Sequence, residues 1–217
     1  MPGRYRRPGA STLRLGRAPR GCGFGPGCAG RLTVGMDPVL DALRSLPVSL
    51  DEARTSVPDE PGLYAVWARF GALPGISGPR HPTAPLQLLY VGTAPNGVEA
   101  KATLRSRVLG EHLRGTTATS ALRRTLAALL SERQGWQSRW TTKPVLVNRD
   151  ELALSEWMAE KLDLTWAEHP EPWTVESAVV AELAPPFNLA EDPADPLHAV
   201  VQAARKQWRD VARAARP

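Results

Sequence analysis

Two short apolar runs in the first half of the chain constrain its fold more than any other feature. Residues 63–68 (LYAVWA) and 86–92 (LQLLYVG) each have the length of a strand and are rich in β-branched, aromatic or aliphatic side chains. Pro61 and Gly62 mark a turn before the first run, and a Gly/Pro-rich stretch at 71–85 separates the two. These features predict two buried strands joined by a long loop.

Helical patterns dominate the rest of the chain. Residues 164–167 (LTWA) form a third, short strand candidate. Asn148 with Glu151 resembles a capping box, and Thr174 resembles a helix cap. The predicted helices cover 37–46, 104–113, 120–130, 148–162, 175–183 and an amphipathic segment that opens at 195. This order predicts one α/β domain over residues 36–217, with a small three-stranded sheet flanked by helices and an extra C-terminal helix.

The N-terminal segment differs from the rest in composition. Residues 1–35 hold seven arginines, no acid, nine of the 18 glycines and both cysteines, Cys22 and Cys28. No helical or strand period is visible, so we expect a disordered basic tail. No apolar stretch follows the basic start, which argues against a secretory signal. Two alternatives stay open: the segment is another kind of targeting peptide, or translation starts at Met36. The two cysteines are either a weak metal-binding signal or incidental thiols.

The net charge of +5 does not describe the predicted domain. Residues 36–217 carry 20 basic and 22 acidic side chains, so the basic excess belongs to the tail. Within the domain, residues 100–149 contain ten Lys or Arg and two acids, whereas 150–195 contain twelve acids and one Lys. This separation favours either a face that binds a polyanion or arginines that pair with the acidic segment.

Other protein classes are excluded by simple counts. No run approaches ~18 consecutive apolar residues, so no membrane-spanning helix is predicted, and we expect a cytoplasmic protein without a membrane partner. Two cysteines in 217 residues exclude a disulfide scaffold.

Four motifs follow one another in chain order. The first two are the tripeptides Gly62-Leu63-Tyr64 and Tyr90-Val91-Gly92. In the third, Arg107 follows Leu104 by three residues. In the fourth, Asn188 follows Glu176 by twelve residues and closes a Pro-Pro-Phe-Asn sequence. Each motif alone is weak, and their order makes the signal.

Over residues 61–189 this order resembles the GIY-YIG nuclease superfamily. The resemblance implies a three-stranded sheet with a signature tyrosine on each of two strands, and a metal-dependent endonuclease that hydrolyses phosphodiester bonds in DNA, with RNA not excluded. The long intervals between motifs resemble the restriction-endonuclease branch. Neither the tail nor the last helix shows anything of the family.

The resemblance implies a role for each matched residue. Tyr64 would be the general base or orient the water, Tyr90 would position water or phosphate, and Arg107 would contact the scissile phosphate with its fork of donors. Some family members have a histidine four residues after the arginine. Here Glu111 holds that position and His112 follows at five, so His112 is a candidate proton donor to the leaving group.

The remaining predictions concern metal, structure and nucleic acid. Glu176 would hold one Mg²⁺ or Mn²⁺, because magnesium keeps several waters and needs few protein ligands. Asn188 would tie down the chain after the glutamate helix, and no small-molecule cofactor is expected. The phosphate-binding face would consist of four arginines, which are Arg105, Arg114, Arg123 and Arg124.

Alternative interpretations of the same residues stay open. The two tyrosines can be core aromatics, Arg107 can simply pair with Glu111, and Glu176 can serve the helix dipole. The chain can then be a nucleic-acid-binding module without catalysis, or a protein-interaction domain.

Overall fold

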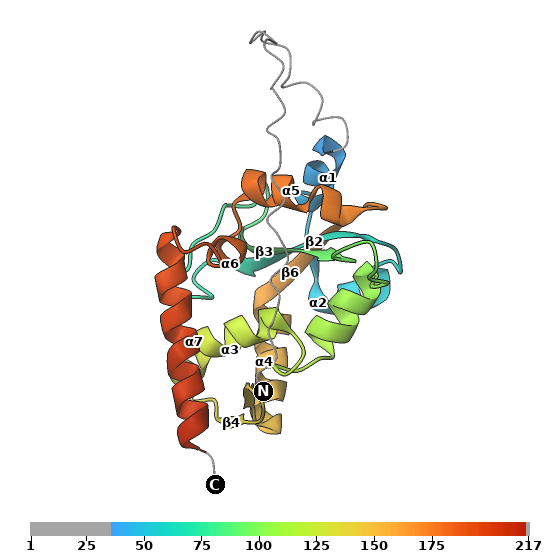
Figure 1. The fold of residues 1–217 in the computed structure, drawn as a ribbon. Coiled ribbons are helices and arrows are strands. Elements are labelled where there is room, and N and C mark those ends of the chain that lie inside the picture. The colour runs from blue at the N-terminus through green and yellow to red at the C-terminus, as the bar shows by residue number, and fades with distance from the viewer. Residues whose placement is uncertain (1–35, 216–217) are drawn as a thin grey trace, which may run out of the picture. The chain divides into compact units, whose positions relative to one another are not determined.

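The computed structural model describes residues 36–215, and the predictions for residues 1–35 lie outside them. The described residues contain a four-stranded antiparallel sheet in the order β1-β6-β2-β3 (Figure 1). The strands are β1 (Val48–Ser49), β2 (Gly62–Arg69), β3 (Leu86–Ala94) and β6 (Leu162–Glu168). The two predicted central strands and the third strand are therefore confirmed.

Helices cover both faces of this sheet. On one face lie α1 (Asp37–Leu43) and α5 (Glu176–Leu183), against alternate residues of β2 such as Leu63 and Trp67. On the other lie α2 (Leu50–Ser56), η1 (Ser106–Leu113), α3 (Ala121–Gln134) and α4 (Asn148–Lys161). Figure 1 shows α1 and α5 above the sheet and α2, α3 and α4 below it. This burial on both faces explains why β2 is apolar without alternation.

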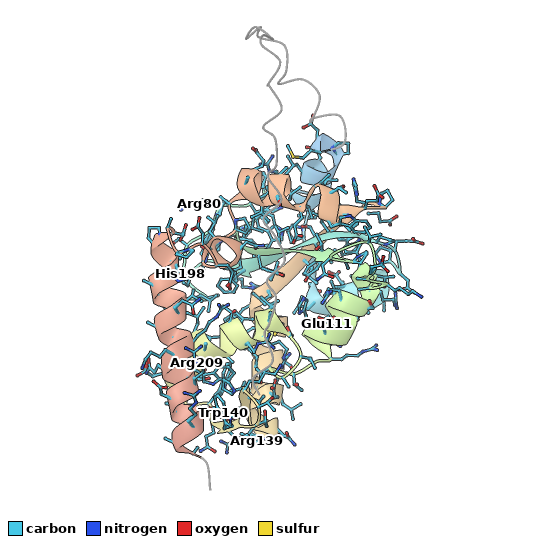
Figure 2. All side chains as sticks on the ribbon, viewed as in Figure 1. Arg80, Glu111, Arg139, Trp140, His198 and Arg209 are labelled. Atoms are coloured by element: carbon cyan, nitrogen blue, oxygen red, sulfur yellow. The ribbon has the colours of Figure 1, made fainter. Side chains whose placement is uncertain are left out.

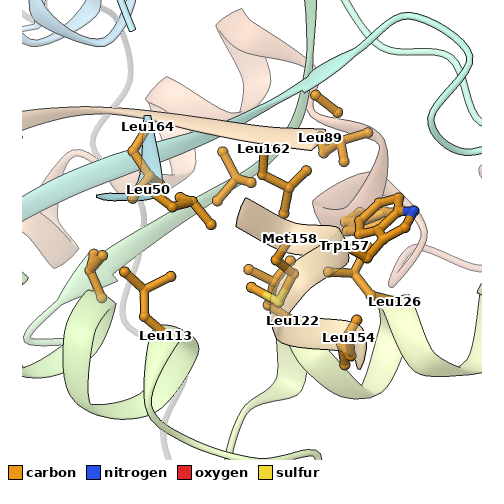
Figure 3. Close-up of a cluster of buried hydrophobic side chains, with 14 of the residues drawn as sticks. Leu50, Leu89, Leu113, Leu122, Leu126, Leu154, Trp157, Met158, Leu162 and Leu164 are labelled. Atoms are coloured by element: carbon orange, nitrogen blue, oxygen red, sulfur yellow. The ribbon is translucent and has the colours of Figure 1, made fainter. Parts of the chain in front are cut away.

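The larger core lies on the second face. Figure 3 shows leucines of α3 and α4 meeting Leu162 and Leu164 of β6 and Leu89 of β3. Tyr64 belongs to the same cluster and is 2% exposed. The catalytic candidates of the sheet therefore face α3 and η1 rather than α1.

The C-terminal part packs beside α3. The long helix α7 (Pro196–Ala214) lies along α3 and along a hairpin of β4 (Ser138–Trp140) and β5 (Pro144–Leu146) (Figure 1). A short turn η2 (Pro172–Thr174) precedes α5, and α6 (Pro186–Leu189) joins α5 to α7. None of the helices within 36–215 has the length and hydrophobicity needed to span a membrane.

Some sequence-based details are wrong. The sheet has four strands rather than three, because the two-residue β1 pairs with β6 and is too short to show alternation. The cap of α4 is Val147, and the Glu151 carboxylate bonds Thr117 instead of closing a box with Asn148. Helix α5 is preceded by Val175, and the Thr174 hydroxyl donates to the Glu171 carbonyl.

Candidate active site

The pairing of β2 with β3 brings the two signature tyrosines together. Their ring centroids lie 6.1 Å apart. Tyr64 stands opposite Gly92 in the ladder, and a Cβ on Gly92 would overlap the Tyr64 ring. Gly92, which ends the second tripeptide, therefore leaves room for the ring of Tyr64, which ends the first.

A buried hydrogen-bonded chain begins at Tyr64. Its hydroxyl lies 2.6 Å from Nε2 of His112, and Nδ1 of the same ring lies 2.7 Å from Oγ of Ser120. Ser120 caps α3, since its Oγ also accepts from the backbone N–H of Arg123. His112 is 6% exposed, and burial, followed by the charges of Arg107 and Arg123, lowers its pKa to about 3. The imidazole is therefore neutral near pH 7, with one ring nitrogen able to accept a proton.

Arg107 and His112 both lie on η1, whose winding is unusual. This segment is a π-helix, and its end is marked by a bond from the N–H of Arg114 to the carbonyl of Leu109, five residues earlier. In a π-helix each N–H bonds the carbonyl five residues earlier, so a turn holds more residues than in an α-helix. Arg107 pairs with Glu111 four residues later, and its charge acts on both His112 and Tyr64.

Arg107 keeps part of its hydrogen-bonding capacity unused. Its Nη1 donates to Oε2 of Glu111 over 2.6 Å, so the predicted pair on the helix exists. Its Nε is buried and has no partner among the described residues. A buried guanidinium N–H without an acceptor is costly, and an anionic oxygen at this point would satisfy it.

Glu176 lies on α5, which covers the other face of the sheet, and is linked to this group through its charge on Tyr90. It is the first residue of α5, is half-buried and forms no ion pair within residues 36–215. Burial raises the pKa of the Tyr90 phenol, and the Glu176 carboxylate raises it further while Arg107 lowers it. Tyr90 is thus within electrostatic range of both groups. No cluster of three or more His, Cys, Asp or Glu suited to a metal occurs in the described part of the chain, so Glu176 is a single carboxylate ligand candidate.

Asn188 fixes the position of Tyr90 from the side. Its Nδ2 donates to the carbonyl of Val91 over 2.8 Å, and its Oδ1 accepts from the Val91 N–H over 2.9 Å. This double hydrogen bond attaches α6 to β3 one residue after Tyr90. Asn188 therefore contacts backbone and orients neighbouring structure.

The four arginines of the predicted phosphate-binding face do not form one face. Arg123 is 1% exposed, and its Nη2 donates to Glu151 Oε2 over 3.0 Å and to the Glu151 carbonyl. It ties α3 to α4 in the core, so its assignment to the surface is corrected. Arg105 and Arg114 are exposed at the two ends of η1, and Arg124 is half-buried.

Arg124 lines a cleft that sequence reasoning missed. The cleft has a volume of about 680 Å³ and runs from Tyr90 and Asn188 to α7. Arg205 and Arg209 of α7 line it as well, four residues apart and therefore on one side of the helix. That spacing was the available signal, and it was missed because the last helix was interpreted only by its apolar face.

The family comparison covers the part of the chain that holds these groups, apart from Arg209. Residues 62–207 match the family model of the GIY-YIG catalytic domain. The chain belongs to the GIY-YIG family. No curated protein and no solved structure matches it. The match continues beyond residue 189 into α7, which corrects the prediction that the last helix lies outside the family resemblance.

Membership of the GIY-YIG family indicates the general class of substrate for this site. The family is one of nucleases, so a nucleic acid is the class of substrate. Tyr64 and Tyr90 are in ring contact, the charge of Arg107 acts on both, and the charge of Glu176 acts on Tyr90.

Proposed function

We propose that this GIY-YIG protein is a metal-dependent endonuclease that hydrolyses phosphodiester bonds in DNA. The observation that carries the proposal is the unpartnered, buried Nε of Arg107, whose charge acts on both tyrosines, together with the free carboxylate of Glu176, which acts on Tyr90. Such a group of donors and acceptors suits a phosphodiester, because an anionic oxygen would satisfy the Arg107 Nε–H.

Arg107 would bind the scissile phosphate. The pair with Glu111 holds the guanidinium in place and leaves Nε to donate to a non-bridging oxygen. Because the charge of Arg107 is fixed before the reaction, it would stabilise the charge that develops on the phosphate at little cost in reorganisation. Tyr90, half-buried at the cleft, would position the water or the phosphate.

Tyr64 and His112 would carry the proton away from the attacking water. Water oxygen forms the new bond to phosphorus, its proton passes to the Tyr64 oxygen, and the proton of Tyr64 moves to Nε2 of His112. The bond to the leaving oxygen breaks, and that oxygen takes a proton from solvent. This assignment gives His112 a role behind Tyr64 in place of donation to the leaving group, because the ring is buried and both nitrogens are engaged within the protein.

Substrate binding would make His112 a better base. Burial and the positive charge of Arg107 lower the pKa of the imidazole in the free protein. A bound phosphate would offset the charge of Arg107, so the pKa of His112 would rise when the substrate is in place.

Glu176 would hold a divalent cation, Mg²⁺ or Mn²⁺. Its carboxylate is partly exposed and without an ion pair among residues 36–215, and a hard oxygen ligand of this kind suits a cation that retains most of its waters. When bound, the cation supplies Lewis-acid stabilisation of the phosphate and of the leaving oxygen.

The test is nicking of supercoiled plasmid with Mg²⁺ or Mn²⁺, with EDTA as the blank. We expect nicking by the full chain and its loss in Glu176→Ala and in Arg107→Ala. The matched control is Glu182→Ala, which removes an exposed acid from the same helix, where it pairs with Arg44 at 3.2 Å. Nicking that persists in both site variants contradicts the assigned site. Metal-independent binding without cleavage would instead identify a non-catalytic binding module.

A further inference from the structure

A cleft between α3 and α7 adjoins the proposed site, and apart from Tyr90 its lining residues have no part in the proposed reaction. Its walls come from α3, from α6, from the residues around the start of β5 and from α7. Figure 2 labels Arg209 on α7, on the side of the molecule away from Glu111 of η1. Tyr90 and Asn188 lie at the end of the cleft nearest the site. A substrate strand that leaves the site past Tyr90 would enter it.

The cleft is strongly positive. Arg124, Lys143, Arg205 and Arg209 line it, against Glu191 as the one carboxylate among its lining residues. Glu191 pairs with Arg205 over 2.8 Å. The other three cations form no ion pair within residues 36–215. Their charges are therefore available to an anion.

Two of these cations are held close to one another. Burial and then the charge of Arg205 lower the pKa of Arg124. Arg205 is fixed by a bond of 2.8 Å from its Nη2 to Oγ1 of Thr125, and Arg124 donates to the carbonyl of Thr117. Like charges kept together in a half-buried cleft repel each other, and a bound phosphate would relieve that repulsion.

The floor of the cleft is apolar. It is formed by Leu122, Phe187 and Trp208, and the indole N–H of Trp208 is buried without a hydrogen-bond partner in the described structure. A row of phosphates on the outside of a duplex needs cations and no apolar recess. A nucleotide whose base is unpaired presents both a phosphate and an apolar sugar and base, as single-strand sites require.

The size of the cleft points the same way. A volume of about 680 Å³ lies in the range of pockets that enclose a molecule of nucleotide size. A B-form duplex, whose major groove alone is about 12 Å wide, is far too large to enter it. A single strand fits this space.

We propose that the cleft between α3 and α7 binds a short unpaired stretch of the substrate strand beside the scissile phosphate. Arg124, Lys143 and Arg209 bind its phosphates, and the apolar floor holds its sugar and base. The inference rests on the proposed nuclease function for the direction of the strand, but its binding step requires neither metal nor cleavage.

The experiment compares Arg209→Gln with Lys206→Gln in the full chain. Both variants remove one positive charge from α7, but Lys206 is exposed, pairs with Asp210 over 2.7 Å and does not line the cleft. Fluorescence anisotropy in EDTA measures affinity for three fluorescent DNA probes: a blunt duplex, the same duplex with a single-stranded extension, and the single strand. Thermal melts check that both variants fold.

We expect Arg209→Gln to weaken binding of the two probes with unpaired nucleotides at least about tenfold, the weight of one charge-assisted hydrogen bond. For the single-stranded probe, the slope of log K (binding constant) against log salt concentration should become less negative by about 0.7. Lys206→Gln should bind like the parent. Equal affinities of the two variants, or an equal loss on blunt duplex, overturn the proposal. If plasmid nicking fails while this pattern holds, the nuclease function is wrong and the strand site remains.

Discussion

The hydroxyl of Tyr64 lies 2.6 Å from Nε2 of His112, with both side chains buried. Burial raises the pKa of Tyr64, and the proposed mechanism would use the imidazole behind it as the group to which this phenol passes a proton.

Replacing His112 by Gln should therefore lower the cleavage rate. The amide keeps a hydrogen-bonding group near Tyr64 but cannot take its proton, and loss of a general base typically costs about 10²- to 10⁴-fold. Single-turnover cleavage with saturating enzyme measures the effect, and anisotropy should show unchanged DNA affinity. A variant that cleaves at the parent rate would show that Tyr64 works without the imidazole.

Replacing Arg107 by Lys should also abolish most activity although the charge is kept. Lysine lacks the fork that holds Glu111 with one nitrogen and leaves another for phosphate. We expect a loss of about 10²-fold in the cleavage rate. Arg54→Lys, on the surface of α2 beside Asp51, is the control and should cleave normally. Equal cleavage rates in the two variants would show that the planar guanidinium of Arg107 is not needed for cleavage.

Gly92→Ala should damage both stability and activity. The added methyl overlaps the Tyr64 ring, and overpacking of this kind costs about 1–3 kcal/mol. Urea unfolding measures the loss, and nicking should fall because Tyr64 must move. Gly97→Ala is the matched control, since nothing lies within 4 Å of its added methyl. A stable and active Gly92→Ala protein would show that the ring contact is not required.

Arg123→Met should destabilise the fold rather than weaken DNA binding directly. It leaves Glu151 buried without its cation, and breaking one partner of a buried pair costs about 3–5 kcal/mol. Chemical unfolding should detect this, whereas Arg124→Met should unfold like the parent and bind single strand more weakly. If Arg123→Met kept its stability and bound single strand more weakly, Arg123 would belong to the binding surface.

Acid should destabilise the protein through His112. Its folded pKa of about 3 lies below the ordinary value of 6.5, so the unfolded state binds the proton first as pH falls. Stability from this group is present above pH 6.5 and is lost toward pH 3, by at most about 1.4 kcal/mol per pH unit. Urea unfolding at several pH values between 7 and 4 should show that the free energy of unfolding falls less steeply with decreasing pH in His112→Gln. An equal fall in both proteins would mean that the ring does not titrate in this range.

The parts of the fold that sequence predicted are those with long, regular patterns. The strands β2 and β3 carry apolar runs, and α3, α4 and α7 carry helical periodicity. The two residues of β1 and the three of β4 or β5 are too short for a period to appear. Their pairing depends on tertiary contacts, which local patterns do not contain.

Order along the chain predicts Tyr64, Tyr90, Arg107 and Glu176 as candidate site residues, but it does not show which phenol is buried. The misplacement of Arg123 was avoidable, since Arg123, Leu126, Ala127 and Leu130 fall on one stripe of α3 and all four are buried. A charge on an apolar stripe indicates a buried partner, here Glu151.

The π-helical winding of η1 limits what a sequence interval can say about its side chains. One residue more or less rotates everything after it by about 100° around an α-helix. In η1 the bonding runs five residues back instead of four, and Gly110 sits within the helix with open space at its Cβ position. An arginine and a histidine on such a segment are therefore related by their positions in space and not by a fixed number of residues between them.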